Sequence, residues 1–276
     1  MSYKTLLVHL DSGPRATVRL QLALELAARS NAHVVGLHAI SVPRMPAYAM
    51  VEGGDSMREY QAKAAAELAA RARAEFERVT AVSGYPSVEW RESRGDAAEV
   101  MPVHARYADL IVVGQGNAED GSGVEFDFVD RTLLAAGRPA LVIPYAGRFP
   151  EIGTRVLVAW NASREATRAV TDALPLLQHA AEVTVIAFNP DRAPHGDVPG
   201  ADIGLFLARH GVKVSVSQER GTDIDAGSLL LSRAADLDAN LMVMGAYGRS
   251  RMQELILGGA TRTILQSMTM PVLMSH

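Results

Sequence analysis

The residues of this chain with the clearest chemical meaning are three spaced glycines in its last third. Gly245 and Gly248 directly follow the apolar run Leu241–Met244, and Gly258 comes after nine further residues. A glycine-rich loop between a strand and the start of a helix presents backbone N–H groups to an anion. Glycine also lets the main chain approach a phosphate with no Cβ in between. The spacing therefore predicts a phosphate-binding loop, and a sharp turn packed closely on a helix is the alternative.

This loop differs from the two commonest phosphate-binding motifs. A Walker A loop places Lys and then Ser or Thr after its last glycine, whereas Gly258 is followed by Gly259. A dinucleotide-binding fingerprint lies in the first βα turn of its fold, whereas Gly245 lies far along the chain. The glycines alone therefore leave the kind of ligand open.

The elements that must position the loop occur twice in the sequence. The run Ala108–Gly114 parallels Ala239–Gly245, and both end in glycine. Each copy then contains Arg-Thr-Leu/Ile-Leu, at Arg131–Leu134 and at Arg262–Leu265, followed by a proline-led apolar run. Self-similarity over half the chain indicates two copies of one structural unit.

The pattern within each copy predicts a parallel sheet covered by helices. Near-continuous apolar runs alternate with helical stretches, which is typical of strands buried on both faces. Each copy reads β-α-β-α-β-α-β-α-β, so we expect two doubly wound α/β domains with five-stranded parallel sheets. The predicted domains are residues 1–146 and 152–276, joined by a linker rich in Gly and Pro. A long helix over 56–82 in the first copy corresponds to a short one over 201–210 in the second.

Composition excludes several classes of function. The chain has 276 residues, a formal net charge of −4 and no cysteine. Disulfides, zinc fingers and thiol catalysis are therefore excluded, and the weakly acidic balance argues against a nucleic-acid partner. No apolar run approaches 18 residues, so we expect no membrane association and a cytoplasmic location.

Taken together, these motifs resemble the universal stress protein A-like family in its tandem form. The resemblance rests on the Asp11-Ser12 and Asn161-Ala162-Ser163 segments, the Ala-Asp-Leu-Ile-Val-Val-Gly strand, G-x2-G-x9-G and the closing Pro-Val-Leu strand. It implies an adenine nucleotide alpha hydrolase-like fold with nucleotide at the C-terminal edge of the sheet. One branch of the family binds ATP or a related adenine nucleotide through this motif, and another branch lacks the motif and binds none detectably.

Position by position, the resemblance assigns a ligand site to the second domain. Its residues are Asn161, Ala162, Phe188 (or its neighbour Ala187), Gly221, Gly245, Gly248, Arg249, Gly258, Gly259 and Thr261. Gly259 replaces the family's hydroxyl residue, while Thr261 keeps the second hydroxyl. Asn161 stands where the family has an acid, and it can still bond a ribose or base. Arg249 and Arg251 could pair with phosphate oxygens.

The corresponding loop of the first domain is predicted not to bind nucleotide. It lacks the glycine spacing and carries the carboxylates of Glu125, Asp127 and Asp130, which would repel a polyphosphate. For Asp11 and Asn161, capping of the following helix is the alternative role, since both types favour helix N-termini.

Other chemically suggestive residues have simpler interpretations. His9 and His38 lie near the ends of neighbouring predicted strands, but no third metal ligand shows at a sensible spacing. We therefore expect neutral histidines and no metal site. His195 lies in a polar loop, either as part of a lid or as a solvated loop. Arg71, Arg73 and Arg78 are expected on the solvated face of the long helix.

We therefore expect a cytoplasmic stress-response protein whose second domain binds ATP or a related adenine nucleotide, with Mg²⁺ as a companion ion, as a sensor or regulator. No catalytic arrangement stands out, so the expected activity is at most weak ATP hydrolysis. The apolar closing strands Ala140–Ile143 and Val272–Met274 would associate in an intrachain pseudo-dimer, since each would otherwise be an exposed edge. Further homodimerisation is open. The alternative is a nucleotide-free interaction scaffold that uses the pseudo-dimer surface.

Overall fold

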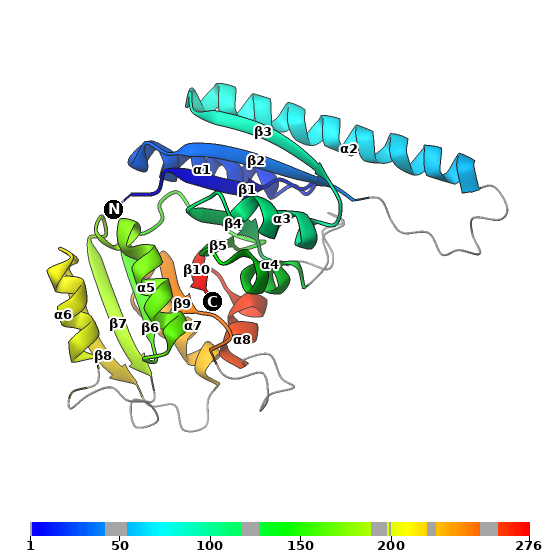
Figure 1. Ribbon diagram of the computed structural model, residues 1–276. Coiled ribbons are helices and arrows are strands. Elements are labelled where there is room, and N and C mark those ends of the chain that lie inside the picture. Colours follow the sequence, from blue (N-terminus) through cyan, green and yellow to red (C-terminus); the bar gives the residue numbers. More distant parts are fainter. Residues whose placement is uncertain are drawn as a thin grey trace. The chain divides into compact units, whose positions relative to one another are not determined.

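The computed structural model describes residues 2–41, 54–116, 127–188, 198, 200–219, 225–248 and 259–276. The chain divides into two compact units, and their elements are labelled in Figure 1. We call Tyr3–Ala136 the first unit, and the second unit is centred on Gly137–His276.

The first unit is a parallel sheet with helices between successive strands. Its elements are β1 (Thr5–His9), α1 (Ala16–Ser30), β2 (His33–Ile40), α2 (Gly54–Ser83), β3 (Val88–Arg94), α3 (Ala97–Ala105), β4 (Leu110–Gly114) and α4 (Phe128–Ala136). The strand order is β3-β2-β1-β4, and Leu7 of β1 lies opposite Val35 on one side and Ile111 on the other. Helix α1 packs against α2, and α3 packs against α4.

The second unit repeats this alternation and adds one antiparallel strand. Its elements are β5 (Ala140–Ile143), β6 (Arg155–Trp160), α5 (Arg164–Leu177), β7 (Glu182–Phe188), α6 (Ala201–Arg209), β8 (Val214–Glu219), α7 (Ala226–Asp236), β9 (Leu241–Gly245), α8 (Gly259–Ser267) and β10 (Val272–Ser275). The strand order is β5-β10-β9-β6-β7-β8. All neighbours run parallel except β5 and β10, which are antiparallel with Leu141 opposite Leu273.

The predicted α/β fold and its repeat are confirmed. Both halves follow the β-α alternation read from the sequence, and the expected difference in helix length holds between α2 and α6. Strand β5 closes the first copy in sequence, but it pairs with β10 and falls in the compact second unit. Ala140–Ile143 is fully buried there, so the pairing covers an apolar edge that would otherwise be exposed.

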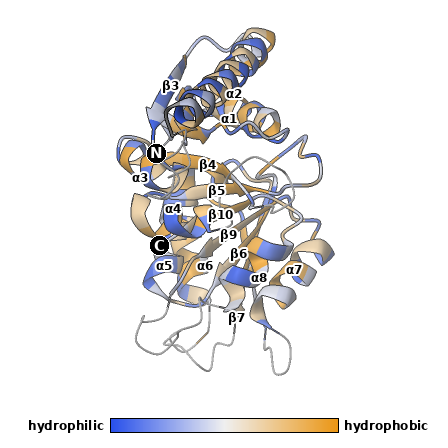
Figure 2. Cartoon of the chain, turned by 90° about the vertical axis from the view of Figure 1, so that its right-hand side faces the viewer, coloured by the Kyte–Doolittle hydropathy of each residue, from blue (hydrophilic) through white to orange (hydrophobic). Residues whose placement is uncertain are grey.

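Burial follows the apolar pattern of the sequence. Strands β4, β9 and β10 are coloured toward the hydrophobic end of the scale in Figure 2, and nearly all of their residues are buried. Helix α2 instead alternates between hydrophilic and hydrophobic colours, as a helix with one solvated face does. Among the described helices, none is long and apolar enough to span a bilayer.

Candidate functional site

The second unit has a topological switch point between β6 and β9. These strands are neighbours, yet the chain continues from β6 outward to β7 and from β9 to β10 on the other side. In open parallel sheets such a divergence leaves a crevice at the carboxyl ends of the two strands, where ligands bind. Helix α5 follows β6 and α8 follows β9, so the N-terminal ends of two helices lie at this crevice.

The turn after β9 is held in place from two sides. The N–H of Ala246 donates to the Ser275 carbonyl (2.8 Å), and the imidazole Nδ1 of His276 bonds the Ala246 carbonyl (3.0 Å). Tyr247 has a left-handed backbone (φ 58°), and its N–H donates to Oγ1 of Thr261 (3.3 Å). The C-terminal strand and the first turn of α8 therefore fix the conformation of this turn.

Both described motif glycines lie against the start of α5. A Cβ added at Gly245 would lie 2.5 Å from the backbone nitrogen of Ala166, so any side chain there would displace main chain. At Gly248 the added Cβ would lie 3.0 Å from Oε2 of Glu165, the tip of a side chain. Close packing on α5 alone therefore accounts for Gly245, whereas backbone packing does not require a glycine at Gly248.

Glu165 is a site residue that the sequence analysis missed. It lies in the first turn of α5 and is 8% exposed, and it forms a long ion pair with the exposed Arg164 (3.6 Å). Its carboxylate borders Gly248, so a negative charge lies beside the predicted phosphate loop. A carboxylate one helical turn after Asn161 was the available signal, because that spacing brings it back toward the strand end.

The segment between β6 and α5 combines a turn with a helix cap. Oδ1 of Asn161 accepts the N–H of Ser163 (3.1 Å), and Ala162 has a left-handed backbone (φ 56°). The residue that caps α5 is Ser163, whose hydroxyl accepts the N–H of Ala166 (3.1 Å). The alternative of helix capping by Asn161 is therefore wrong, and Asn161 is an exposed residue of the turn between β6 and α5.

The remaining predicted site residues fall at α8, at β7 or outside the described residues. Gly259 begins α8, and a Cβ there would meet only Oδ1 of Asp225 at 3.6 Å, so glycine is not required for packing. Asp225 caps α7 and was another residue that the sequence analysis missed. Thr261 is 3% exposed and lies in the first turn of α8. Outside the described residues lie Gly221, Arg249 and Gly258, with Arg251, Glu125 and His195, and Phe188 is described only as the backbone that ends β7.

In the first unit the equivalent position is filled by an arginine. Gly114 ends β4 as Gly245 ends β9, and a Cβ added there would lie 2.6 Å from Nη1 of Arg19. The guanidinium is 3% exposed; its Nη2 bonds Oδ2 of Asp11 (2.6 Å) and its Nε donates to the His9 carbonyl (3.1 Å). The space above Gly114 is therefore occupied by a buried ion pair of the protein itself.

This network corrects the capping alternative for Asp11. The residue at the start of α1 is Arg15, which makes no side-chain cap, and Asp11 instead accepts the Gly13 N–H (2.9 Å) and pairs with Arg19. By contrast, Asp96 caps α3, because its side chain accepts the N–H of Ala98 (2.8 Å). Asp11 therefore anchors a buried cation, which is a structural role.

Burial and neighbouring charge set the protonation of this network. Burial, opposed only in part by Asp11, lowers the pKa of His9 to about 4. Burial by itself would raise the pKa of Asp11, but the charges of Arg19 and His9 and the hydrogen bonds it accepts lower it overall. Near neutral pH the network therefore consists of a neutral imidazole beside a carboxylate–guanidinium pair.

The neutral His9 predicts an acid-sensitive first unit. Between pH 6.5 and 4 the unfolded imidazole takes up a proton while the buried one does not, so stability is full above pH 6.5 and falls as pH drops to about 4. That difference corresponds to about 3 kcal/mol. Urea unfolding at the two ends of this range, followed through Trp90 in a Trp160→Phe background, measures it. His9→Gln should remove most of the loss, whereas the exposed His179→Gln should not; an equal loss in both variants would contradict the assignment.

The described histidines do not form a metal site. His38 bonds the Leu10 carbonyl through Nδ1 (2.6 Å) and stacks on Trp90, while His9 packs against Phe128. Within the described ranges, no three His, Asp or Glu side chains gather in a way that could hold an ion.

Comparison with known proteins follows the same two-part division. The model of the universal stress protein family matches residues 2–124 and again 154–276. No curated protein matches the chain significantly. Among solved structures, a universal stress protein from Archaeoglobus fulgidus DSM 4304 is 17% identical, with 98% of this chain and 97% of that chain covered and a TM-score of 0.74. A putative universal stress protein from Pseudomonas aeruginosa UCBPP-PA14 is 19% identical, with coverages of 99% and 93% and a TM-score of 0.61. At these identities the structures establish the fold.

Proposed function

The chain belongs to the universal stress protein family, in tandem form, and from this premise we propose that its second unit binds an adenine nucleotide, ATP or a close relative. In this proposal the occupied second unit is the sensing or regulatory element of a cytoplasmic stress-response protein. The first unit is the divergent partner that holds no nucleotide. The tandem domains form an intrachain pseudo-dimer, in which the closing strands associate.

The observation that carries the proposal is the contrast between two equivalent positions. In the second unit, the turn Gly245–Gly248 and the N-terminal ends of α5 and α8 converge at the switch point. In the first unit, Arg19 fills the corresponding space over Gly114. If neither half bound a ligand, a side chain could fill the crevice in each of them, as Arg19 does in the first unit. The difference between the two units therefore favours a ligand in the second.

The residues of the second unit suit distinct parts of a nucleotide. The backbone N–H groups at Gly248 and at the start of α8 would face the phosphates, and Thr261 offers a hydroxyl in the first turn of that helix. The amide of Asn161 would bond the ribose or the base. When bound, Mg²⁺ would neutralise phosphate charge, and it is commonly held by one or two carboxylates together with phosphate oxygens. Glu165 beside Gly248 fits a metal-loaded nucleotide better than a bare one.

Calorimetric titration with Mg-ATP tests the proposal. We expect one site per chain in the wild type. Gly248→Trp should abolish binding, because its indole would fill the crevice beside Glu165. Leu237→Trp is the matched control, since it adds the same side chain at the exposed end of α7, where that helix leads into β9. If the folded wild type shows no heat of binding at about 1 mM nucleotide, the proposal is wrong.

Replacement of Glu165 by glutamine should strengthen binding of metal-free nucleotide. The change removes a buried negative charge beside the loop and keeps the shape of the side chain. With charges separated by a few ångströms near a protein surface, an effect of about tenfold in affinity is expected. ADP titrated in the presence of EDTA measures it, with the exposed Glu182→Gln as control. If both variants bind ADP as the wild type does, Glu165 does not face the phosphates.

The second candidate function is a nucleotide-free interaction scaffold. Two observations favour it: Gly259 replaces a phosphate-binding hydroxyl residue, and the Glu165 carboxylate borders the loop. Protein purified without added ligand separates the candidates. Adenine absorbance in the supernatant of the denatured protein supports the nucleotide site. A supernatant without adenine absorbance, together with no calorimetric binding of Mg-ATP, supports the scaffold.

A further inference from the structure

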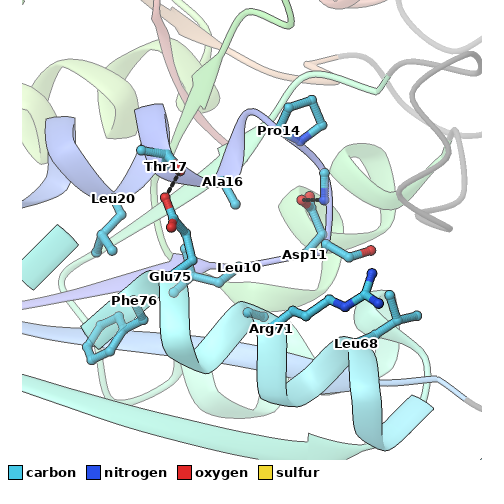
Figure 3. Close-up of a pocket in the computed structure, with 13 residues that line it drawn as sticks. Leu10, Asp11, Pro14, Ala16, Thr17, Leu20, Leu68, Arg71, Glu75 and Phe76 are labelled. Carbon is cyan, nitrogen blue, oxygen red and sulfur yellow. Dashed lines mark hydrogen bonds between the residues drawn. The ribbon is translucent and has the colours of Figure 1, made fainter. Parts of the chain in front are cut away.

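The first unit contains a cavity that the nucleotide proposal does not use. It has a volume of about 320 Å³ and lies between α1 and α2, beside the segment that follows β1 (Figure 3). The residues that line it include Leu10, Asp11, Leu20, Arg71, Glu75 and Phe76. Gly114 and Arg19 do not line it, but Asp11, the ion-pair partner of Arg19, does, so the cavity adjoins the buried ion pair. A volume of this size lies at the lower end of small-molecule sites.

The floor of the cavity is apolar. Leu10, Leu20 and Phe76 are each no more than 5% exposed, and they come from the segment after β1, from α1 and from α2. The floor therefore suits the hydrocarbon part of a ligand, and a ligand that covers it removes apolar surface from water.

Two carboxylates at the rim are already satisfied by the protein. Asp11 is held by Arg19 and by the N–H of Gly13. Glu75 accepts two hydrogen bonds from Arg78 (2.6 and 2.8 Å) and one from the hydroxyl of Thr17 (2.6 Å). Neither carboxylate therefore needs a cationic ligand to balance its charge.

The rim also carries a cation that makes no ion pair within the part of the chain that the structure describes. Arg71 lies one turn before Glu75 on α2, and Figure 3 shows its side chain reaching along the helix between Leu68 and Asp11. Its neighbour Arg73 is different, because it pairs with Glu77 on the solvated surface (2.9 Å). Arg71 and Arg73 are both exposed, as predicted for this helix face, and Arg71 also borders the cavity. Ala16 and Thr17 of the first turn of α1 line the same cavity, so the positive end of that helix adds to the field.

We propose that this cavity binds a small amphipathic monocarboxylate, with its hydrocarbon part on the Leu10–Leu20–Phe76 floor and its carboxylate on Arg71. A guanidinium presents two parallel N–H donors that match the two oxygens of a carboxylate. The closed apolar floor limits the ligand to a short chain or a single ring. This site belongs to the first unit and does not depend on nucleotide binding by the second.

Titration of the full chain with octanoate, followed by backbone amide NMR, tests the assignment, and 1-octanol serves as the uncharged probe. Shifts are expected along α1 and α2, with octanoate binding about tenfold more tightly than octanol. Arg71→Ala should remove this preference, and Arg73→Ala should keep it. Ala72→Phe, which fills the cavity from α2, should weaken both probes, with its amide spectrum confirming that the variant is folded.

Three outcomes of these titrations would contradict the proposal. Absence of shifts at about 5 mM octanoate shows that no such site exists. Equal losses in Arg71→Ala and Arg73→Ala assign the effect to net charge. Unchanged binding in folded Ala72→Phe places the probes elsewhere on the chain.

Discussion

Replacement of Arg19 by alanine is expected to destabilise the first unit by about 3–5 kcal/mol, as removal of one partner from a buried ion pair does. The guanidinium is almost fully buried and is bonded to Asp11 and to the His9 carbonyl. Its loss leaves a buried carboxylate without a countercharge and a cavity over Gly114. Both effects act in the same direction.

Urea unfolding followed through Trp90, in the Trp160→Phe background, measures this loss. Arg73→Ala removes an arginine from an exposed pair with Glu77 and should change stability by less than about 1 kcal/mol. The double variant Arg19→Leu/Asp11→Leu should recover much of the loss, because no unpaired charge then remains buried. An Arg19→Ala variant no less stable than Arg73→Ala would show that the pair does not hold the first unit together.

The Gly245→Ala substitution is expected to destabilise the second unit by about 1–3 kcal/mol, the usual cost of forcing extra volume into a packed site. The added Cβ would lie 2.5 Å from the backbone nitrogen of Ala166, so β9 and α5 must separate. Because α5 borders the switch point, nucleotide affinity should fall in the same variant.

Gly248→Ala provides the matched comparison. There the nearest atom is the carboxylate tip of Glu165 at 3.0 Å, which can rotate away, so the cost should be well below that of Gly245→Ala. Trp160 fluorescence in a Trp90→Phe background measures both variants. Equal destabilisation by the two substitutions would mean that α5 does not pack on Gly245 as described.

The sequence predicted the fold because two independent patterns agreed. Apolar runs such as Leu110–Gly114 and Leu241–Gly245 are buried parallel strands, and the Arg-Thr-Leu/Ile-Leu segments after them fall in α4 and α8. The association of the two closing strands was predicted from their apolar edges, and β5 and β10 do pair. The membership of β5 in the compact second unit was not predictable from local sequence, because it depends on this contact between segments more than a hundred residues apart.

The candidate site was predicted less completely than the fold. The positions of Gly245, Gly248 and Thr261 in one turn and the adjoining helix followed from their spacing. The roles of Arg19 and Glu165 did not, because both are charged residues in helix sequences that otherwise indicate ordinary amphipathic helices. Charged side chains are seldom buried, so pattern alone assigns them to solvent. Their burial here depends on what the neighbouring strand ends present.

Hydrogen–deuterium exchange with and without Mg-ATP is the sharpest test of a single nucleotide site in the second unit, because it reports where the nucleotide binds as well as whether it does. We expect slower exchange in the second unit, over residues 161–166, 245–248 and 259–261. We expect no change over residues 9–19 and 114–116 of the first unit, where Arg19 fills the equivalent space. Protection in the first unit, or unchanged exchange throughout at saturating nucleotide, would contradict the assignment of one nucleotide site to the second unit.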